Sequence, residues 1–297
     1  MSAKPFALLV ALLAVFWVAW VANAYVRVPL GSLNVANVIV TIIFVALPIV
    51  IIAAAARLHW RPLAAIGVVM TCLAVVTFAR GGGPGLDGIV QISRFGWPAA
   101  LGFVISGLIK DRNLLLPIAM VLATVDLLAV FAPAGTVNQG LQSPTIRPIF
   151  DALAYQVPEA GTAQPLAQMG PADPLFIAMF LYAIRKFGMK FRRTLLWLIP
   201  ALAAYLGIVL IFGSATIFGF SLGALPALVP VAFVVAIVNA REFRMSKQEI
   251  AMTVVVAAVC VGLVAAMLTV WRAEPGSPPV PTALQLGPTV PDTSLVS

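Results

Sequence analysis

The chain alternates long apolar runs with short polar connections. Apolar runs of about 18 residues or more have the length of a helix that crosses a lipid bilayer. Nine runs are predicted to be transmembrane helices, over residues 5–24, 35–56, 62–80, 89–109, 114–133, 168–187, 194–213, 224–240 and 249–271. Arg94, Gly96 and Pro98 interrupt the fourth run, and the sixth is short unless it begins before Asp173. The pattern predicts an all-α polytopic membrane protein.

These runs divide the chain into four parts. Residues 1–113 are predicted to be N-terminal transmembrane helices, and residues 114–240 a transmembrane core with a long loop over 134–167. Residues 241–272 add one C-terminal transmembrane helix. The tail, 273–297, is rich in proline and is predicted to be disordered.

The long loop contains a further helix signal, and the first run can be interpreted in two ways. Within the loop, the stretch IRPIFDALAY is predicted to form a short interfacial helix, and the rest is predicted to be mobile. The first run has two interpretations, since Lys4 and the apolar stretch before Ala24 resemble a cleavable signal peptide. That stretch is longer than a usual signal core, which favours a retained helix.

Composition supports the membrane assignment. The 297 residues are 62% hydrophobic and 9% charged, whereas soluble domains carry about 25% charged residues. The net charge of +8 does not indicate a nucleic-acid partner, because Lys and Arg lie between the apolar runs. With nine crossings, most of the 18 basic residues fall on one side together with the N-terminus. The positive-inside rule places that side in the cytoplasm and the loop 134–167 outside.

No metal or cofactor site is predicted. Cys72 and Cys260 lie far apart within apolar runs, which is typical of inert packing residues. The single histidine, His59, stands beside Trp60 and is interpreted as a membrane-interface residue.

Two acids occupy costly positions. Asp126 lies inside the run LLLPIAMVLATVDLLAVF, and a carboxylate in hydrocarbon is a functional-site hypothesis by default. It is consistent with a catalytic acid, an ion or proton relay, or a structurally paired acid. Asp173 begins the next apolar run, in MGPADPLFIAMFLYAI. Because Pro174 follows it, Asp173 also fits a helix N-cap.

Two carboxylates that lie close together in a low dielectric do not both ionise, so such a pair shares a proton. One member then takes a proton from water, and the other donates to the carbonyl under attack. The later segment ALPALVP adds Pro226 and Pro230, which lack backbone donors and hinder a regular helix at its start. Carbonyls freed there can face a polar cavity or a bound peptide.

The segments VDLLAVFAPAG, MGPADPLF and ALPALVP occur in this order. Together they resemble the three signatures of the intramembrane aspartyl proteases of the presenilin and signal peptide peptidase family, and are closer to presenilin. The resemblance implies a presenilin-like fold in which the following residues form the site: Asp126 and Asp173 as the catalytic pair, with Gly170, Ala172, Pro226, Ala227 and Leu228 shaping it.

This chain departs from the family pattern at three positions. Val125 replaces a Tyr, Ala172 replaces a Gly, and Pro174 follows the second acid. The acids also fall in the fifth and sixth predicted helices, whereas the family carries them in its sixth and seventh.

The resemblance implies hydrolysis of transmembrane protein substrates in the bilayer without a cofactor. The alternatives are a catalytically impaired, presenilin-like membrane binding protein and an ion-coupled transporter that uses Asp126. The Ala- and Val-rich composition and short loops suggest a prokaryotic inner membrane. The sequence does not identify the substrates or an oligomeric state.

Overall fold

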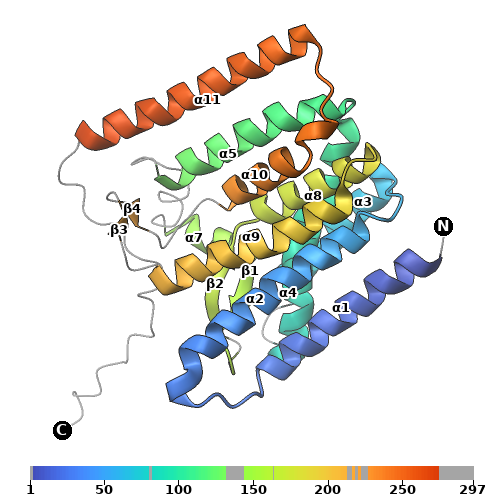
Figure 1. Ribbon diagram of the computed structural model, residues 1–297. Helices are drawn as coiled ribbons and strands as arrows, with labels where there is room; N and C mark the ends of the chain where they lie inside the picture. Colours follow the sequence, from blue (N-terminus) through green and yellow to red (C-terminus); the bar gives the residue numbers. More distant parts are fainter. Residues whose placement is uncertain are drawn as a thin grey trace.

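A computed structural model describes residues 3–79, 82–131, 144–162, 164–212, 216–217, 220–221 and 227–273. Helices dominate this part of the chain (Figure 1). The α-helices are α1 (Ala3–Asn23), α2 (Leu33–Ala55), α3 (Pro62–Phe78), α4 (Gly83–Leu108), α5 (Leu115–Phe131), α7 (Arg147–Leu153), α8 (Ala172–Lys186), α9 (Phe191–Phe212), α10 (Leu228–Val238) and α11 (Lys247–Ala273). The strands are β1 (Tyr155–Pro158), β2 (Pro165–Met169), β3 (Thr216–Ile217) and β4 (Phe220–Ser221), and short 3-10 helices lie at Leu30–Ser32, Arg112–Leu114 and Ala240–Glu242.

The prediction of a mostly helical membrane protein is confirmed. A helix lies in each of the nine predicted ranges. Among the described residues, five helical segments are long and apolar enough to cross a membrane: Lys4–Asn23, Leu33–Ala55, Gly83–Leu108, Arg112–Val130 and Lys247–Thr269. Helices α3 and α10 are apolar but shorter. Nine crossings therefore remain a prediction.

Two boundaries differ from the sequence prediction. Helix α4 runs without a break through Arg94, Gly96 and Pro98, and it starts at Gly83 rather than at residue 89. The sixth helix was predicted to begin at residue 168, which is wrong, since α8 begins at Ala172. The preceding residues form β2, whose backbone groups pair with β1 instead of continuing a helix.

Helix α8 forms the centre of the structure. It packs against α2, α4, α9 and α10, and most of its side chains are buried. The α4–α8 contact is close at Gly102, where a Cβ atom would collide with the carbonyl oxygen of Leu175. Helix α11 packs on α5 at one side of the molecule, and α1 packs on α2 and α4 at the other (Figure 1). Asp173 thus stands at the start of the most enclosed helix.

An aromatic cluster joins α1, α2, α4 and β1. The Phe16 ring lies 5.6 Å from Phe44 and 5.4 Å from Phe95, measured between ring centroids. Tyr155 is fully buried and donates a 2.6 Å hydrogen bond to the Phe44 carbonyl. Helix α1 therefore contributes Phe16 to the folded core.

The predicted loop 134–167 is more ordered than expected. Residues 132–143 and 163 lie outside the described residues, and the predicted short helix is confirmed as α7. The chain then forms an antiparallel β1–β2 hairpin, so the prediction of a mobile segment is wrong here. Asn23 and Asn37 hold the hairpin turn, and Gln91 of α4 accepts from the Gln156 amide at 3.0 Å. Polar side chains on distant helices provide this order.

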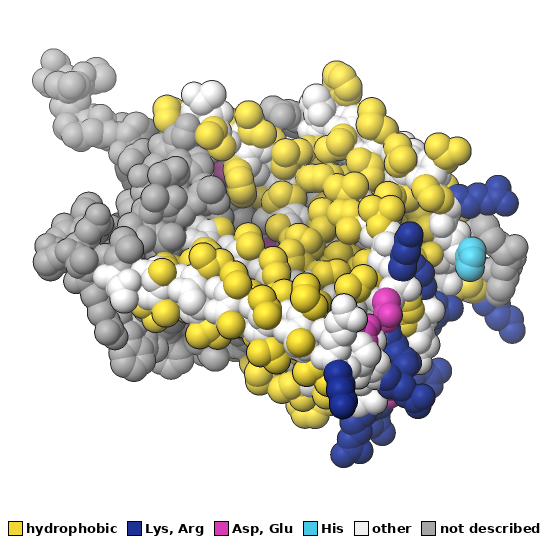
Figure 2. All heavy atoms as spheres, turned by 90° about the horizontal axis from the view of Figure 1, so that it is seen from above, with side chains coloured by type: hydrophobic (Ala, Val, Ile, Leu, Met, Phe, Trp, Pro, Cys, Tyr) yellow, Lys and Arg dark blue, Asp and Glu magenta, His cyan; other side chains and the backbone are white. Residues whose placement is uncertain are grey.

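Basic side chains gather at one end of the apolar surface (Figure 2). Contacts tie together the chain connections at this end: Lys186 Nζ donates to the Ile109 carbonyl at 2.7 Å, and Lys190 forms a 3.3 Å ion pair with Glu242. Asn113 Nδ2 donates to the Arg244 carbonyl at 3.0 Å. The connections α4–α5, α8–α9 and α10–α11 thus share one basic end. The C-terminal tail lies outside the described residues after Ala273.

Candidate functional site

Asp126 connects α5 to the start of α10. Its Oδ2 atom accepts a 2.8 Å hydrogen bond from the backbone amide of Leu228, the first residue of α10. Helix starts leave amide donors without intrahelical acceptors, and the α10 N-cap residue, Ala227, has no side chain that can satisfy them. A carboxylate from a different helix therefore caps α10, in the place where the helix dipole favours negative charge.

Asp173 lies in the first turn of α8 but does not cap it. The N-cap position belongs to Pro171, and no side-chain cap bond forms there. The interpretation of Asp173 as an N-cap is therefore wrong. Its backbone amide donates to the Gly170 carbonyl at 3.2 Å. The carboxylate remains available for other partners.

The two acids come together at the start of α10. This helix packs against both α5 and α8, so its first turn stands between the helices that carry the acids. The Asp126 and Asp173 carboxylates lie near enough for their charges to interact. Both side chains are partly buried. The structure therefore brings into one place two carboxylates that are separated by a long loop in the sequence.

Gly170 and Ala172 border Asp173. A Cβ atom on Gly170 would lie 3.9 Å from Asp173 Oδ2, at ordinary contact distance. Gly170 is not among the described glycines with positive φ. Ala172 is the first residue of α8 and adopts the helical conformation that suits alanine. The alanine at this position therefore introduces no backbone strain beside Asp173.

The predicted Pro-Ala-Leu segment is described in part. Pro226 lies outside the described residues. Ala227 is the N-cap residue of α10, and Leu228 supplies the amide that meets Asp126. The Leu228 side chain is buried, and Pro230 falls in the first turn of α10, where a proline is tolerated. The segment meets the first acid through a backbone amide.

Sequence reasoning missed one residue of the site, Tyr205 on α9. Its hydroxyl is buried and has no hydrogen-bond partner within the described part of the chain. The phenol interacts electrostatically with both Asp173 and Asp126. Buried tyrosine hydroxyls usually find a partner, which makes this one unusual. A polar atom within the apolar run of α9 was the available sequence signal.

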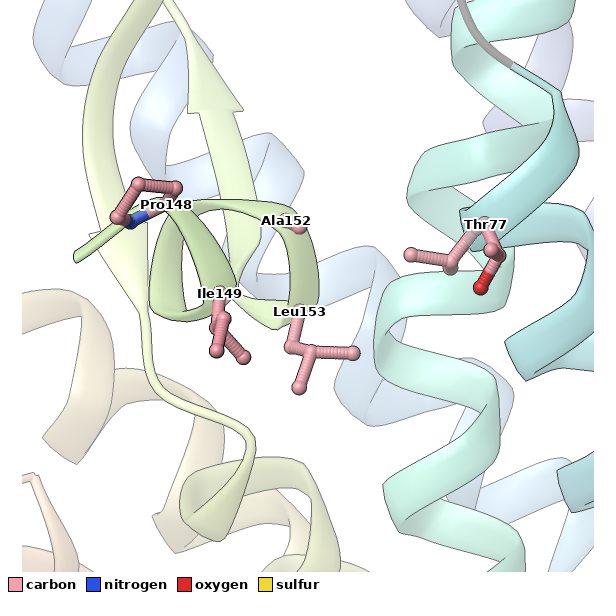
Figure 3. A pocket seen from close by; sticks show the side chains of 6 residues that line it. Thr77, Pro148, Ile149, Ala152 and Leu153 are labelled. Carbon is pink, nitrogen blue, oxygen red and sulfur yellow. The ribbon is translucent and has the colours of Figure 1, made fainter. Parts of the chain in front are cut away.

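Two cavities among the described residues lie away from the acids. One, of about 310 Å³, separates α3 from α7, where Thr77 faces Ile149 and Leu153 (Figure 3). The other, of about 460 Å³, is lined by residues at the basic end, among them Leu116 and Arg244. Neither includes Asp126 or Asp173. Most residues that line these cavities are apolar, whereas the two acids carry reactive groups.

Among the described residues, no group of three or more His, Cys, Asp or Glu residues comes together that could hold a metal ion. Comparison of the chain with models of protein families, with curated proteins and with solved structures gave no significant match. The groups of the candidate site are the two interacting carboxylates, the Leu228 amide, and the Tyr205 phenol, which has no partner among the described residues.

Proposed function

We propose that the protein is an intramembrane aspartyl protease, similar to presenilin, that hydrolyses peptide bonds within transmembrane segments. One observation carries the proposal: Asp126 and Asp173 interact at a site where separate apolar helices meet. Buried structural acids are usually paired with a cation. Asp126 instead caps α10 through the Leu228 amide and also lies near a second acid. Two such carboxylates share a proton, which is the arrangement that general acid–base hydrolysis requires.

The amide of Leu228 suggests how the two acids divide their roles. Hydrogen bonding to a carboxylate favours its charged form, and a helix N-terminus does the same. We assign the general base to Asp126 and the general acid to Asp173. Asp126 takes a proton from water as the water oxygen bonds to the scissile carbonyl carbon, and Asp173 donates its proton to the carbonyl oxygen. Asp126 then passes its proton to the amide nitrogen, the C–N bond breaks, and Asp173 takes a proton back from a hydroxyl of the tetrahedral intermediate as the carboxylic acid product forms.

The β1–β2 hairpin offers a means of holding the substrate. A transmembrane helix hides its carbonyls in hydrogen bonds, so it must unwind before it can be cleaved. Strand β2 pairs with β1 on one edge and ends at Met169, immediately before Gly170. An extended substrate segment that pairs with the other edge of β2 would run toward Asp173.

The proposal includes nine membrane crossings with the basic end in the cytoplasm of a prokaryotic cell. The clustering of basic residues at one end of the helices supports this orientation (Figure 2). The hairpin would then lie toward the outer face, close to the level of Asp173. Transmembrane proteins in the same bilayer are the substrates.

A cleavage assay tests the proposed function. The purified protein is reconstituted in lipid with single-span reporter proteins of both orientations, beside Asp126→Asn and Asp173→Asn. The wild type is expected to release fragments, and each variant to lose about 100-fold or more in rate. Asp151→Asn is the matched control, since this acid is 39% exposed on α7 and lies 3.8 Å from Arg147. The amide keeps an oxygen acceptor for the 3.3 Å hydrogen bond that Gln168 of β2 donates. A folded wild type that leaves every reporter intact would exclude the proposed activity.

Such a result would favour the second candidate, a presenilin-like membrane binding protein without catalysis. The departures at Val125 and Ala172 motivate it. Reporters would then bind without being cut, and Ala172→Gly would not restore cleavage. The transporter alternative rests on Asp126 alone, and the bond to Leu228 already gives that acid a structural partner.

A further inference from the structure

Tyr205 differs from the other buried polar groups that lack a partner among the described residues. Those groups are Trp20 on α1, Thr41 on α2, and Trp97 and Ser106 on α4. Tyr205 lies on α9, which packs against α10 and α8. Its phenol lies near enough to Asp173 and Asp126 to interact electrostatically with both.

Among the residues that the structure describes, the Tyr205 hydroxyl is a donor without an acceptor. Burying a hydroxyl without a hydrogen bond costs free energy. A bound molecule that offers an acceptor to this hydroxyl would recover that free energy. Packing alone does not require the oxygen, because a phenylalanine ring would fill the same space. Tyr155 shows the contrast, since its buried hydroxyl already donates to the Phe44 carbonyl. Among the described residues this donor is therefore free to meet an acceptor on a bound molecule.

We propose that the Tyr205 hydroxyl is a catalytic group that donates a hydrogen bond to the oxygen of the scissile carbonyl as water adds to it. This inference rests on the proposed proteolytic function. When the carbonyl carbon becomes tetrahedral, its oxygen gains negative charge beside the acids. A preorganised donor aimed at that oxygen stabilises the transition state more than the bound substrate. Tyr205 would thus complement Asp173, which supplies the proton.

Tyr205→Phe tests the inference, because it removes one oxygen atom and keeps the ring. Loss of an oxyanion donor typically lowers kcat by about 100- to 1,000-fold. We expect that loss in reporter cleavage, with KM changed by less than about threefold. Tyr155→Phe is the matched control, as it removes a buried hydroxyl that is already bonded within the fold. Tyr205→His, which keeps a ring N–H donor, is expected to restore part of the lost rate.

A binding measurement gives a second readout that does not need turnover. The probes are two apolar peptides, one with a hydrated difluoroketone and one with a hydroxyethylene group in place of the scissile bond. The difluoroketone hydrate carries two hydroxyl groups, like the tetrahedral intermediate, and the hydroxyethylene carries one. The wild type and Tyr155→Phe are expected to prefer the hydrate by about 10-fold or more. Tyr205→Phe is expected to lose this preference and keep its affinity for the hydroxyethylene.

The outcomes separate the two proposals. If Tyr205→Phe keeps the wild-type kcat and the same preference between the probes, Tyr205 is a packing residue and the proteolytic function stands. If Asp126→Asn and Asp173→Asn cleave like the wild type, the proteolytic function itself fails. If the wild type neither cleaves reporters nor binds either probe, both proposals are overturned. If it binds the probes without cleaving, the comparison of affinities still decides the role of Tyr205.

Discussion

The backbone amide of Leu228 donates a 2.8 Å hydrogen bond to the Asp126 carboxylate across 102 residues of sequence. The bond joins the middle of α5 to the first turn of α10, which also packs on α8. One carboxylate thus caps a helix and faces a second acid. The local fold of α10 and the geometry of the candidate site therefore depend on the same side chain.

This dual role predicts that two substitutions of Asp126 will differ in their effect on stability. Asp126→Asn keeps an oxygen acceptor for the Leu228 amide, so it is expected to stay near wild-type stability while losing cleavage. Asp126→Leu removes the acceptor and leaves the first amide of α10 unsatisfied, which is expected to cost about 1–2 kcal/mol. Thermal unfolding in detergent measures both. Equal stability of the two variants would show that the bond to Leu228 contributes nothing.

The close approach of α4 and α8 predicts a clear steric effect at Gly102. In Gly102→Ala the new methyl group would collide with the Leu175 carbonyl, so the helices must separate, at a cost of about 1–3 kcal/mol. Because α8 carries Asp173, cleavage should fall as well. Gly107→Ala on the same helix is the control, since no atom lies within 4 Å of its Cβ position. An identical response in unfolding experiments would argue against tight packing at Gly102.

Asn23 is predicted to hold the β1–β2 hairpin in place. Its Nδ2 atom donates to the carbonyls of Glu159 and Thr162 at 2.8 and 2.9 Å. In Asn23→Ala these bonds are lost, and hydrogen exchange in the hairpin turn should become at least severalfold faster. The exposed Asn34 on α2 provides the control variant, Asn34→Ala. Unchanged exchange in Asn23→Ala would mean that the other contacts are sufficient to hold the turn.

Tyr155 predicts a loss of stability in alkali. Burial raises the pKa of this phenol well above its ordinary value of 10.0. The neutral form is therefore favoured in the folded protein, so its contribution is complete below pH 10.0 and declines as pH rises above that value. Tyr155→Phe should be less stable by about 1 kcal/mol at neutral pH, and this difference should shrink in alkali. Unfolding of both proteins across this pH range measures it, and a constant difference would contradict the prediction.

The sequence was sufficient to locate the helices and the two acids. A helix lies in each of the nine apolar runs of bilayer length, because a chain in lipid must satisfy its backbone groups within each segment. Asp126 and Asp173 stood out for the same reason, since a carboxylate among apolar residues is costly. The apolar runs did not predict where each helix begins and ends. Helix α8 begins at Ala172 because the preceding residues form β2, which pairs with β1.

The tertiary structure decided which groups meet. No local pattern indicated that the Leu228 amide would bond to Asp126, or that Tyr205 of α9 would lie beside both acids. The order of the β1–β2 hairpin likewise comes from Asn23 and other side chains on distant helices. Helix formation depends on runs of apolar residues and on the apolar solvent around them, so it can be predicted from the local sequence. The site depends on contacts between segments far apart in the chain, which exist only after the helices have packed.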